Sequence, residues 1–117
     1  MRQEIESILA DGISHFTQNY LGRRPKHIGT HLLGDMLVVR LQGALSAAEQ
    51  QMAKGLSAEK GRDLLKRMRA DLIEQTRVVL EALVENTTGS KVVSLHHDIS
   101  TITGEEVVVF TLAAGAS

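Results

Sequence analysis

The sequence has little of several residue types, and each shortage excludes a class of function. The chain of 117 residues contains no cysteine, which excludes disulfides, thiolate metal sites and cysteine nucleophiles. Aromatic residues make up only 3% and tryptophan is absent, so stacking surfaces for bases or sugars are poorly supplied. The 13 basic residues are balanced by 14 acidic ones, whereas a general nucleic-acid-binding protein carries a basic excess. We therefore expect no nucleic-acid partner.

Long apolar runs are also missing. No run approaches the roughly 18 residues that a membrane span requires, so we expect no transmembrane segment. The first residues include Arg2, Glu4 and Glu6, where a secretory signal would have its apolar core. Hydrophobic residues still make up 43% of the chain, enough to form a folded core. The sequence thus predicts a single cytoplasmic domain over residues 1–117.

The first part of the chain predicts a helix followed by a β-hairpin. Apolar residues recur every three or four positions over residues 4–20, which is the period of an amphipathic helix. Gly22 and Pro25 end this pattern. Two short apolar segments follow, residues 28–33 and 36–41, and the Gly-Asp pair between them suits a tight hairpin turn.

The middle of the chain predicts two helices. Ser46 and Glu49 have the spacing of a capping box, which opens a short helix that ends near Lys54. A second and much longer helix, with Ser57 as its N-cap, runs to about Asn86. Its apolar stripe consists of Leu65, Met68, Leu72, Val79 and Leu83.

The length of the second helix bears on assembly. At 1.5 Å per residue it would be roughly 43 Å long, against a domain diameter of roughly 35 Å. It should therefore overhang its own domain, and its apolar stripe would need a partner. A homodimer is the simplest solution, and a kink or break in the helix is the alternative.

The end of the chain predicts a second hairpin. Residues 91–99 and 106–112 are rich in β-branched residues, and the segment between them is rich in turn formers. The complete order is α-β-β-α-α-β-β. It predicts an α+β domain in which two antiparallel hairpins form one sheet, packed against the N-terminal helix and the long central helix.

Two blocks of sequence resemble the bacterial MpsC-like family. The first block contains Gly-Arg-Arg-Pro at residues 22–25, the hairpin at residues 34–43 and Leu-Ser-Ala-Ala-Glu at residues 45–49. The second contains residues 88–94, His-His-Asp-Ile-Ser-Thr at residues 96–101 and the final strand at residues 107–112. The family usually has glycine before the proline, where Arg24 stands here. The resemblance spans nearly the whole chain and implies a small cytosolic accessory to a membrane ion-transport system, without established catalytic residues.

Four residues are candidate metal ligands: His27, His31, His96 and Asp98. Alternation along each strand puts the first two on one face of their strand and the last two on one face of theirs. A metal site needs three or four convergent ligands, so these residues could form one only if the two strands are neighbours. The competing interpretation places His96 and Asp98 on a solvated face and His97 partly in the core. We expect no bound metal or cofactor.

The basic residues predict binding surfaces rather than catalytic groups. Arg23, Arg24 and Lys26 concentrate positive charge around the proline and could hold a phosphate, an acidic lipid headgroup or an acidic patch of a partner. The long helix carries a basic stripe that includes Arg69, but acidic residues lie at i,i+4 spacing along the same helix. Arg40 interrupts an apolar strand, and we expect it on the solvent face.

These observations favour a non-enzymatic protein, because no complete catalytic constellation is present. The leading hypothesis is a homodimeric accessory protein that binds a membrane transporter or a regulatory protein. Its candidate interaction residues are Arg23, Arg24, Lys26, Leu72 and Val79. The alternative is a small-molecule or metal-ion sensor that uses the histidine-bearing face of the sheet.

Overall fold

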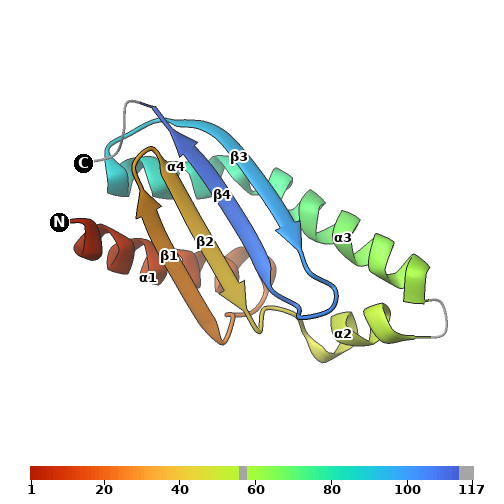
Figure 1. Ribbon diagram of the computed structural model, residues 1–117. Helices are drawn as coiled ribbons and strands as arrows, with labels where there is room; N and C mark the ends of the chain where they lie inside the picture. Colours follow the sequence, from red (N-terminus) through yellow and green to blue (C-terminus); the bar gives the residue numbers. More distant parts are fainter. Residues whose placement is uncertain (56–57, 114–117) are drawn as a thin grey trace.

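The computed structural model describes residues 1–55 and 58–113 and confirms the predicted α+β fold (Figure 1). The elements are α1 (Arg2–Leu21), β1 (His27–Leu33), β2 (Met36–Gln42), α2 (Ala47–Lys54), α3 (Ala58–Gln75), α4 (Arg77–Thr88), β3 (Val92–Ile99) and β4 (Glu106–Leu112). The predicted capping box of α2 is present, with reciprocal hydrogen bonds between Ser46 and Glu49. The predicted N-cap Ser57 lies outside the described residues.

The two hairpins form a single sheet. Its strand order is β1-β2-β4-β3, and each neighbouring pair is antiparallel. The second strand of each hairpin therefore lies at the centre, and β1 and β3 form opposite edges (Figure 1). Positive φ angles at Gly34 and Gly104 allow the turns that close the two hairpins.

Helices cover one face of this sheet. α1 and α4 lie behind the strands in Figure 1, and α3 continues beyond the edge of the sheet. Alternate residues of the strands point toward the helices, where Leu37, Val39 and Phe110 are almost completely buried. Leu9, Ile13, Leu80 and Val84 close this core from the helical side. α1 and α4 approach closely because Gly12 has no side chain to meet Leu83.

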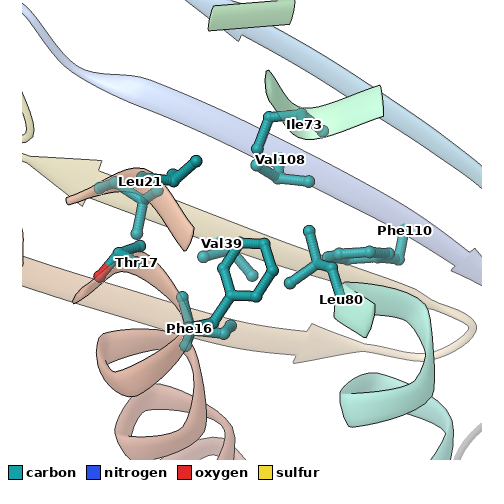
Figure 2. Close-up of a pocket in the computed structure, with 10 residues that line it drawn as sticks. Phe16, Thr17, Leu21, Val39, Ile73, Leu80, Val108 and Phe110 are labelled. Atoms are coloured by element: carbon teal, nitrogen blue, oxygen red, sulfur yellow. The ribbon is translucent and has the colours of Figure 1, made fainter. Parts of the chain in front are cut away.

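The core contains one small void between the helices and the sheet (Figure 2). Its volume is about 10 Å³, which is about the least that can hold one water molecule, and its lining is apolar apart from Thr17. Phe16, Val39 and Leu80 lie around it in Figure 2. The void is far too small for a metabolite, so it is a packing defect rather than a ligand site.

The long central helix is broken, which corrects the prediction of one continuous helix to Asn86. α3 ends at Gln75, Thr76 has φ −102° and ψ 6°, and α4 runs from Arg77 to Thr88. The Thr76 hydroxyl donates to the Leu72 carbonyl at 2.6 Å, a side-chain bond that bends helices. The break lets α4 lie against the sheet while α3 takes a different direction.

The predicted overhang is present, but this chain covers part of it itself. The molecule is 48 Å long and about 23 Å across, and the first half of α3 extends past the sheet (Figure 1). α2 packs against it, and a second core forms from Leu45, Ala53, Leu65 and Ile99. The contact is close because Gly61 faces the backbone of Met52, where an added Cβ would lie 1.8 Å from the carbonyl oxygen.

Candidate functional site

The other face of the sheet is not covered by any helix in the described part of the chain, and we call it the open face (Figure 1). Its residues include His27, His31, Leu33, Met36, Val38, Arg40, His96, Asp98, Val107, Val109 and Thr111. Leu33 is 59% exposed and Met36 is 41% exposed, although both are large apolar residues. An apolar surface with a polar border is typical of a contact with another protein.

Strand register sets the residues of the open face in rows across the sheet. The central row runs His31–Val38–Val109–His96 from one edge to the other. Its two valines occupy the middle strands and its two histidines occupy the edges. This row therefore has the same order of residue types from either side.

The four candidate metal ligands lie on this face but do not converge. His27 and His31 belong to β1, and His96 and Asp98 belong to β3. These strands are three inter-strand spacings apart, which is about 14 Å at roughly 4.8 Å per spacing. Among the described residues, no three His, Asp or Glu side chains are grouped so that they could hold a metal ion. The condition for a metal site formed by these four residues, adjacent strands, is therefore not met.

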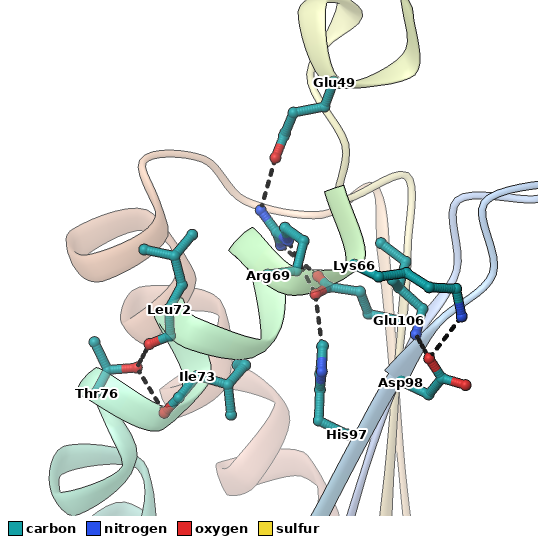
Figure 3. Close-up of polar contacts among 10 residues, drawn as sticks. Glu49, Lys66, Arg69, Leu72, Ile73, Thr76, His97, Asp98 and Glu106 are labelled. Carbon is teal, nitrogen blue, oxygen red and sulfur yellow. Dashed lines mark hydrogen bonds and ion pairs between the residues drawn. The ribbon is translucent and has the colours of Figure 1, made fainter. Parts of the chain in front are cut away.

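Ion pairs border the open face. Arg40 is exposed, as expected, and its Nε donates to Glu105 at 2.7 Å, a partner that the sequence had not singled out. Lys66 of α3 donates to Asp98 at 3.0 Å (Figure 3). The hydrogen bond from Arg40 lowers the pKa of Glu105, and the hydrogen bond from Lys66 lowers the pKa of Asp98. Both carboxylates are thus held in their charged form.

A buried polar cluster lies on the helical side of the sheet, and we call it the Arg69 cluster (Figure 3). Arg69 of α3 is 3% exposed and Glu106 of β4 is completely buried. The guanidinium binds both carboxylate oxygens of Glu106, through Nε at 3.0 Å and through a second, shorter bond. It also donates to Glu49 of α2 at 3.3 Å, and the His97 ring donates through Nε2 to Glu106 at 2.9 Å.

Electrostatics keeps Glu106 and Arg69 of this cluster ionised. Burial alone would raise the pKa of Glu106, but the hydrogen bonds from His97 and Arg69 and the positive charge of Arg69 lower it below its ordinary value. Burial opposes the charge of Arg69, yet its two carboxylate partners raise its pKa. Because Glu106 has no exposed surface, the cluster cannot meet a substrate as it stands. It joins α2, α3 and the sheet.

The sequence contains a signal for this cluster in the alternation of β4 and the spacing of α3. Glu106 has the same alternation phase as Val108 and Phe110, which are buried, so it had to point into the core. Arg69 follows Leu65 by four residues and therefore lies on the buried side of α3. His97 was predicted to be a partly buried core histidine, and its side chain is 6% exposed.

The predicted interaction residues are separated in the structure. Arg24 lies at the exposed end of α1 near His15, while Arg23 donates to the carbonyl of Gly43 at 3.4 Å. Lys26 lines a cavity with residues of α2 and of the β3–β4 turn. On the helices, Leu72 is half-buried. Val79 is 41% exposed on α4.

The remaining stripe residues are largely occupied within the chain. Leu65 is buried in the second core, and Leu83 packs against α1. The stripe therefore needs no second chain to cover most of it. The length of the helix is therefore not, by itself, a reason to expect a homodimer.

No helix among the described residues combines the length and the apolar character that a membrane crossing needs. A family model described as "Na+-translocating membrane potential-generating system (MpsC)" matches residues 1–114. The chain belongs to the MpsC family. A relative of this chain, the "Uncharacterized protein YbcI" of Bacillus subtilis (strain 168), is 36% identical over 108 residues, which cover 92% of this chain and 85% of that protein. No solved structure matches this MpsC-family chain.

Proposed function

We propose that this MpsC-family chain is a non-enzymatic accessory protein that forms a homodimer through its open face and associates, on the cytoplasmic side, with a membrane ion-transport system. The observation that carries the dimer is the row His31–Val38–Val109–His96 at the centre of the open face. The family description, which names a sodium-translocating system, supports the membrane association. The complete burial of Glu106 within the Arg69 cluster favours a structural role for these charges over a catalytic one.

The central row suits a twofold interface. Two copies that pack open face to open face can be related by a twofold axis that lies between the sheets, parallel to the strands and midway between β2 and β4. This axis places the β1–β2 half of one copy opposite the β4–β3 half of the other. The valines of one copy then oppose the valines of the other, and the His31 position opposes the His96 position. An isologous interface requires this kind of self-complementary surface. The same axis places Arg40 one strand away from Asp98 of the second copy, so that opposite charges approach each other.

The edges of the sheet are less suited to association than its face. The backbone N–H of Leu32 on β1 donates to Glu6 of α1 at 2.7 Å, and that of Val92 on β3 donates to Glu85 of α4 at 2.8 Å. Each edge strand thus has an outward donor that a carboxylate of its own chain already occupies. Such capping discourages the addition of a further strand.

The area of the open face predicts a weak dimer. Three strands of seven residues and one of eight span about 23 by 19 Å, which is a flat area of about 440 Å² for each copy. Stable interfaces usually bury about 1,200–2,000 Å² in total, so the total for two copies, about 880 Å², lies below this range and among the weak, transient contacts. We expect a dissociation constant in the micromolar range rather than the nanomolar range.

Sedimentation equilibrium from low to high micromolar concentration tests the dimer. Val109→Asp should shift the protein to monomers, because it places a charge at the centre of the apolar row on both copies. Met36→Asp, at a more exposed site of the same face, should weaken the dimer with less risk to the fold. The matched control is Val78→Asp on α4, where the side chain is 81% exposed and lies away from the open face. A wild-type chain that stays monomeric at high micromolar concentration would refute the dimer.

The membrane association needs a separate experiment. Tagged protein should copurify with an ion-transport protein from detergent-solubilised membranes of the native host, identified by mass spectrometry against an untagged strain. Absence of any transport protein above that background would contradict this part of the proposal, whatever the oligomeric state.

A further inference from the structure

We infer that a cavity between the β3–β4 turn, α2 and the segment before β1 is a binding site for the phosphate group of a small anion or a lipid headgroup. We call it the loop cavity. Its volume is about 250 Å³, and its lining includes Lys26, Gly43, Lys54, Thr101, Thr103 and Gly104. This volume is just below that of pockets for drug-sized ligands, which begin at about 300 Å³, and it suits a phosphate group with a small attached moiety.

The charge of the loop cavity is of one sign. Lys26 and Lys54 approach it from different elements, and no carboxylate occurs among the described residues that line it. Arg23 adds a third positive charge beside it, since its guanidinium donates to the carbonyl of Gly43, and its buried Nε has no hydrogen-bond partner among the described residues. Lysine ammonium groups and hydroxyl donors are common partners of phosphate oxygens.

Carboxylates close in sequence to the cavity are occupied elsewhere. Glu49 of α2 accepts hydrogen bonds from Arg69 and from the backbone of Ser46. Glu105, next to Gly104, accepts hydrogen bonds from Arg40 and Gln42. Neither of these carboxylates pairs with Lys26 or Lys54, and the two lysines line one cavity with no ion pair among the described residues.

The position of Lys26 is constrained by its surroundings. Gly43 has a φ of +69°, and a Cβ on it would lie 2.7 Å from Cγ of Lys26. The stem of this lysine thus lies directly on the glycine backbone, which limits the directions that its ammonium group can take. Holding a charged group in place before a ligand arrives reduces the entropy cost of binding.

The phosphate could belong to a soluble compound or to a lipid, and one residue helps to distinguish them. Ile102, at the tip of the β3–β4 turn, is 92% exposed and borders the loop cavity. An exposed apolar residue beside two lysines suits the boundary between lipid headgroups and acyl chains. It would contribute nothing to the binding of inorganic phosphate.

Titration with inorganic phosphate at constant ionic strength, followed by amide resonances in NMR, is the first test. The amides of Gly43, Thr101, Thr103 and Gly104 should shift together and saturate. The double variant Lys26→Gln/Lys54→Gln should weaken phosphate binding at least about tenfold, because two charge-assisted contacts are lost. The matched control, Lys60→Gln/Lys91→Gln, makes the same change of net charge away from the cavity and should stay within about twofold of wild type.

Cosedimentation with phosphatidylcholine vesicles, with and without phosphatidic acid, is the second test. Binding that requires phosphatidic acid, is lost in Lys26→Gln/Lys54→Gln and is weakened by Ile102→Ser would assign the phosphate to a lipid headgroup. A saturable response to inorganic phosphate with no vesicle binding would assign it to a soluble compound. If neither probe binds, or if the control variant loses as much binding as the cavity variant, the inference is wrong. None of these results depends on the dimer through the open face.

Discussion

Replacement of Arg69 by methionine should cost a large part of the stability of this protein. The guanidinium makes three hydrogen bonds to two carboxylates, at a position that is 3% exposed. Arg69→Met keeps much of the side-chain volume but leaves Glu106 buried with His97 as its remaining side-chain donor. Removing one partner of a buried ion pair typically costs about 3–5 kcal/mol. Since domains are stable by only about 5–15 kcal/mol, the loss should be obvious.

Replacing both partners should cost much less than replacing one. In Arg69→Met/Glu106→Leu no buried charge is left without a partner, and such replacements are often neutral or stabilising by about 1–4 kcal/mol. His97 and Glu49 then lose a partner, so we expect the double variant to lie between wild type and Arg69→Met. Urea unfolding followed by circular dichroism gives the free energies, and the thermodynamic cycle gives the coupling between the two residues.

The matched control is Arg77→Met on α4. Arg77 also binds two carboxylates, Glu74 at the end of α3 at 3.2 Å and Glu81 of α4 at 2.6 Å, but all three side chains are partly exposed. Its replacement should leave the unfolding midpoint nearly unchanged, because exposed pairs contribute little. If Arg69→Met cost as little stability as Arg77→Met, the reasoning from burial would be refuted. The same holds if the losses of Arg69→Met and Glu106→Leu, each measured alone, simply added in the double variant.

Two further predictions concern packing and pH. Gly61→Ala should destabilise the protein by about 1–3 kcal/mol in urea unfolding, because the new Cβ would lie 1.8 Å from the Met52 carbonyl oxygen and force α2 away from α3; a variant as stable as wild type would contradict this close approach. The lowered pKa of Glu106 means that the unfolded chain takes up protons at a higher pH than the folded one, so stability should fall as the pH falls below the ordinary value of 4.5 and through the folded value. Urea midpoints measured between about pH 7 and about pH 3 should show this fall, and Arg69→Met/Glu106→Leu should show less of it.

The strands were predictable because their patterns are local. Residues 106–112 alternate in burial along the whole of β4, and the predicted limits of that strand agree with the structure. The helix break at Thr76 was not predictable in the same way. The spacing from Ile73 to Leu80 is seven residues, so the apolar pattern continues through the break without a change of phase. The bend depends on the hydrogen bond of the Thr76 hydroxyl and on the packing of α4 against the sheet. The spacing of apolar residues along the helix shows neither of these contacts.

The candidate sites differed in how much the sequence could show. Alternation correctly placed His96 and Asp98 on the face opposite to His97, because the phase of a strand is a local property. It could not show that β1 and β3 lie at opposite edges, because the order of strands in a sheet depends on how the two hairpins dock. The metal-site hypothesis depended on that order, and for this reason spacing within each strand could not decide it.

The loop cavity illustrates the same limit for a site made from several segments. The basic residues around Pro25 were visible in the sequence, but the structure uses them separately: Arg24 lies near His15, and of the three only Lys26 lines the cavity. The second lysine, Lys54, comes from the last turn of α2. α2 reaches that position through its close contact with α3 and through the bond from Arg69 to Glu49. Arg69, which does not itself line the cavity, thus helps to hold the helix that supplies the second lysine, and so the Arg69 cluster and the loop cavity share α2.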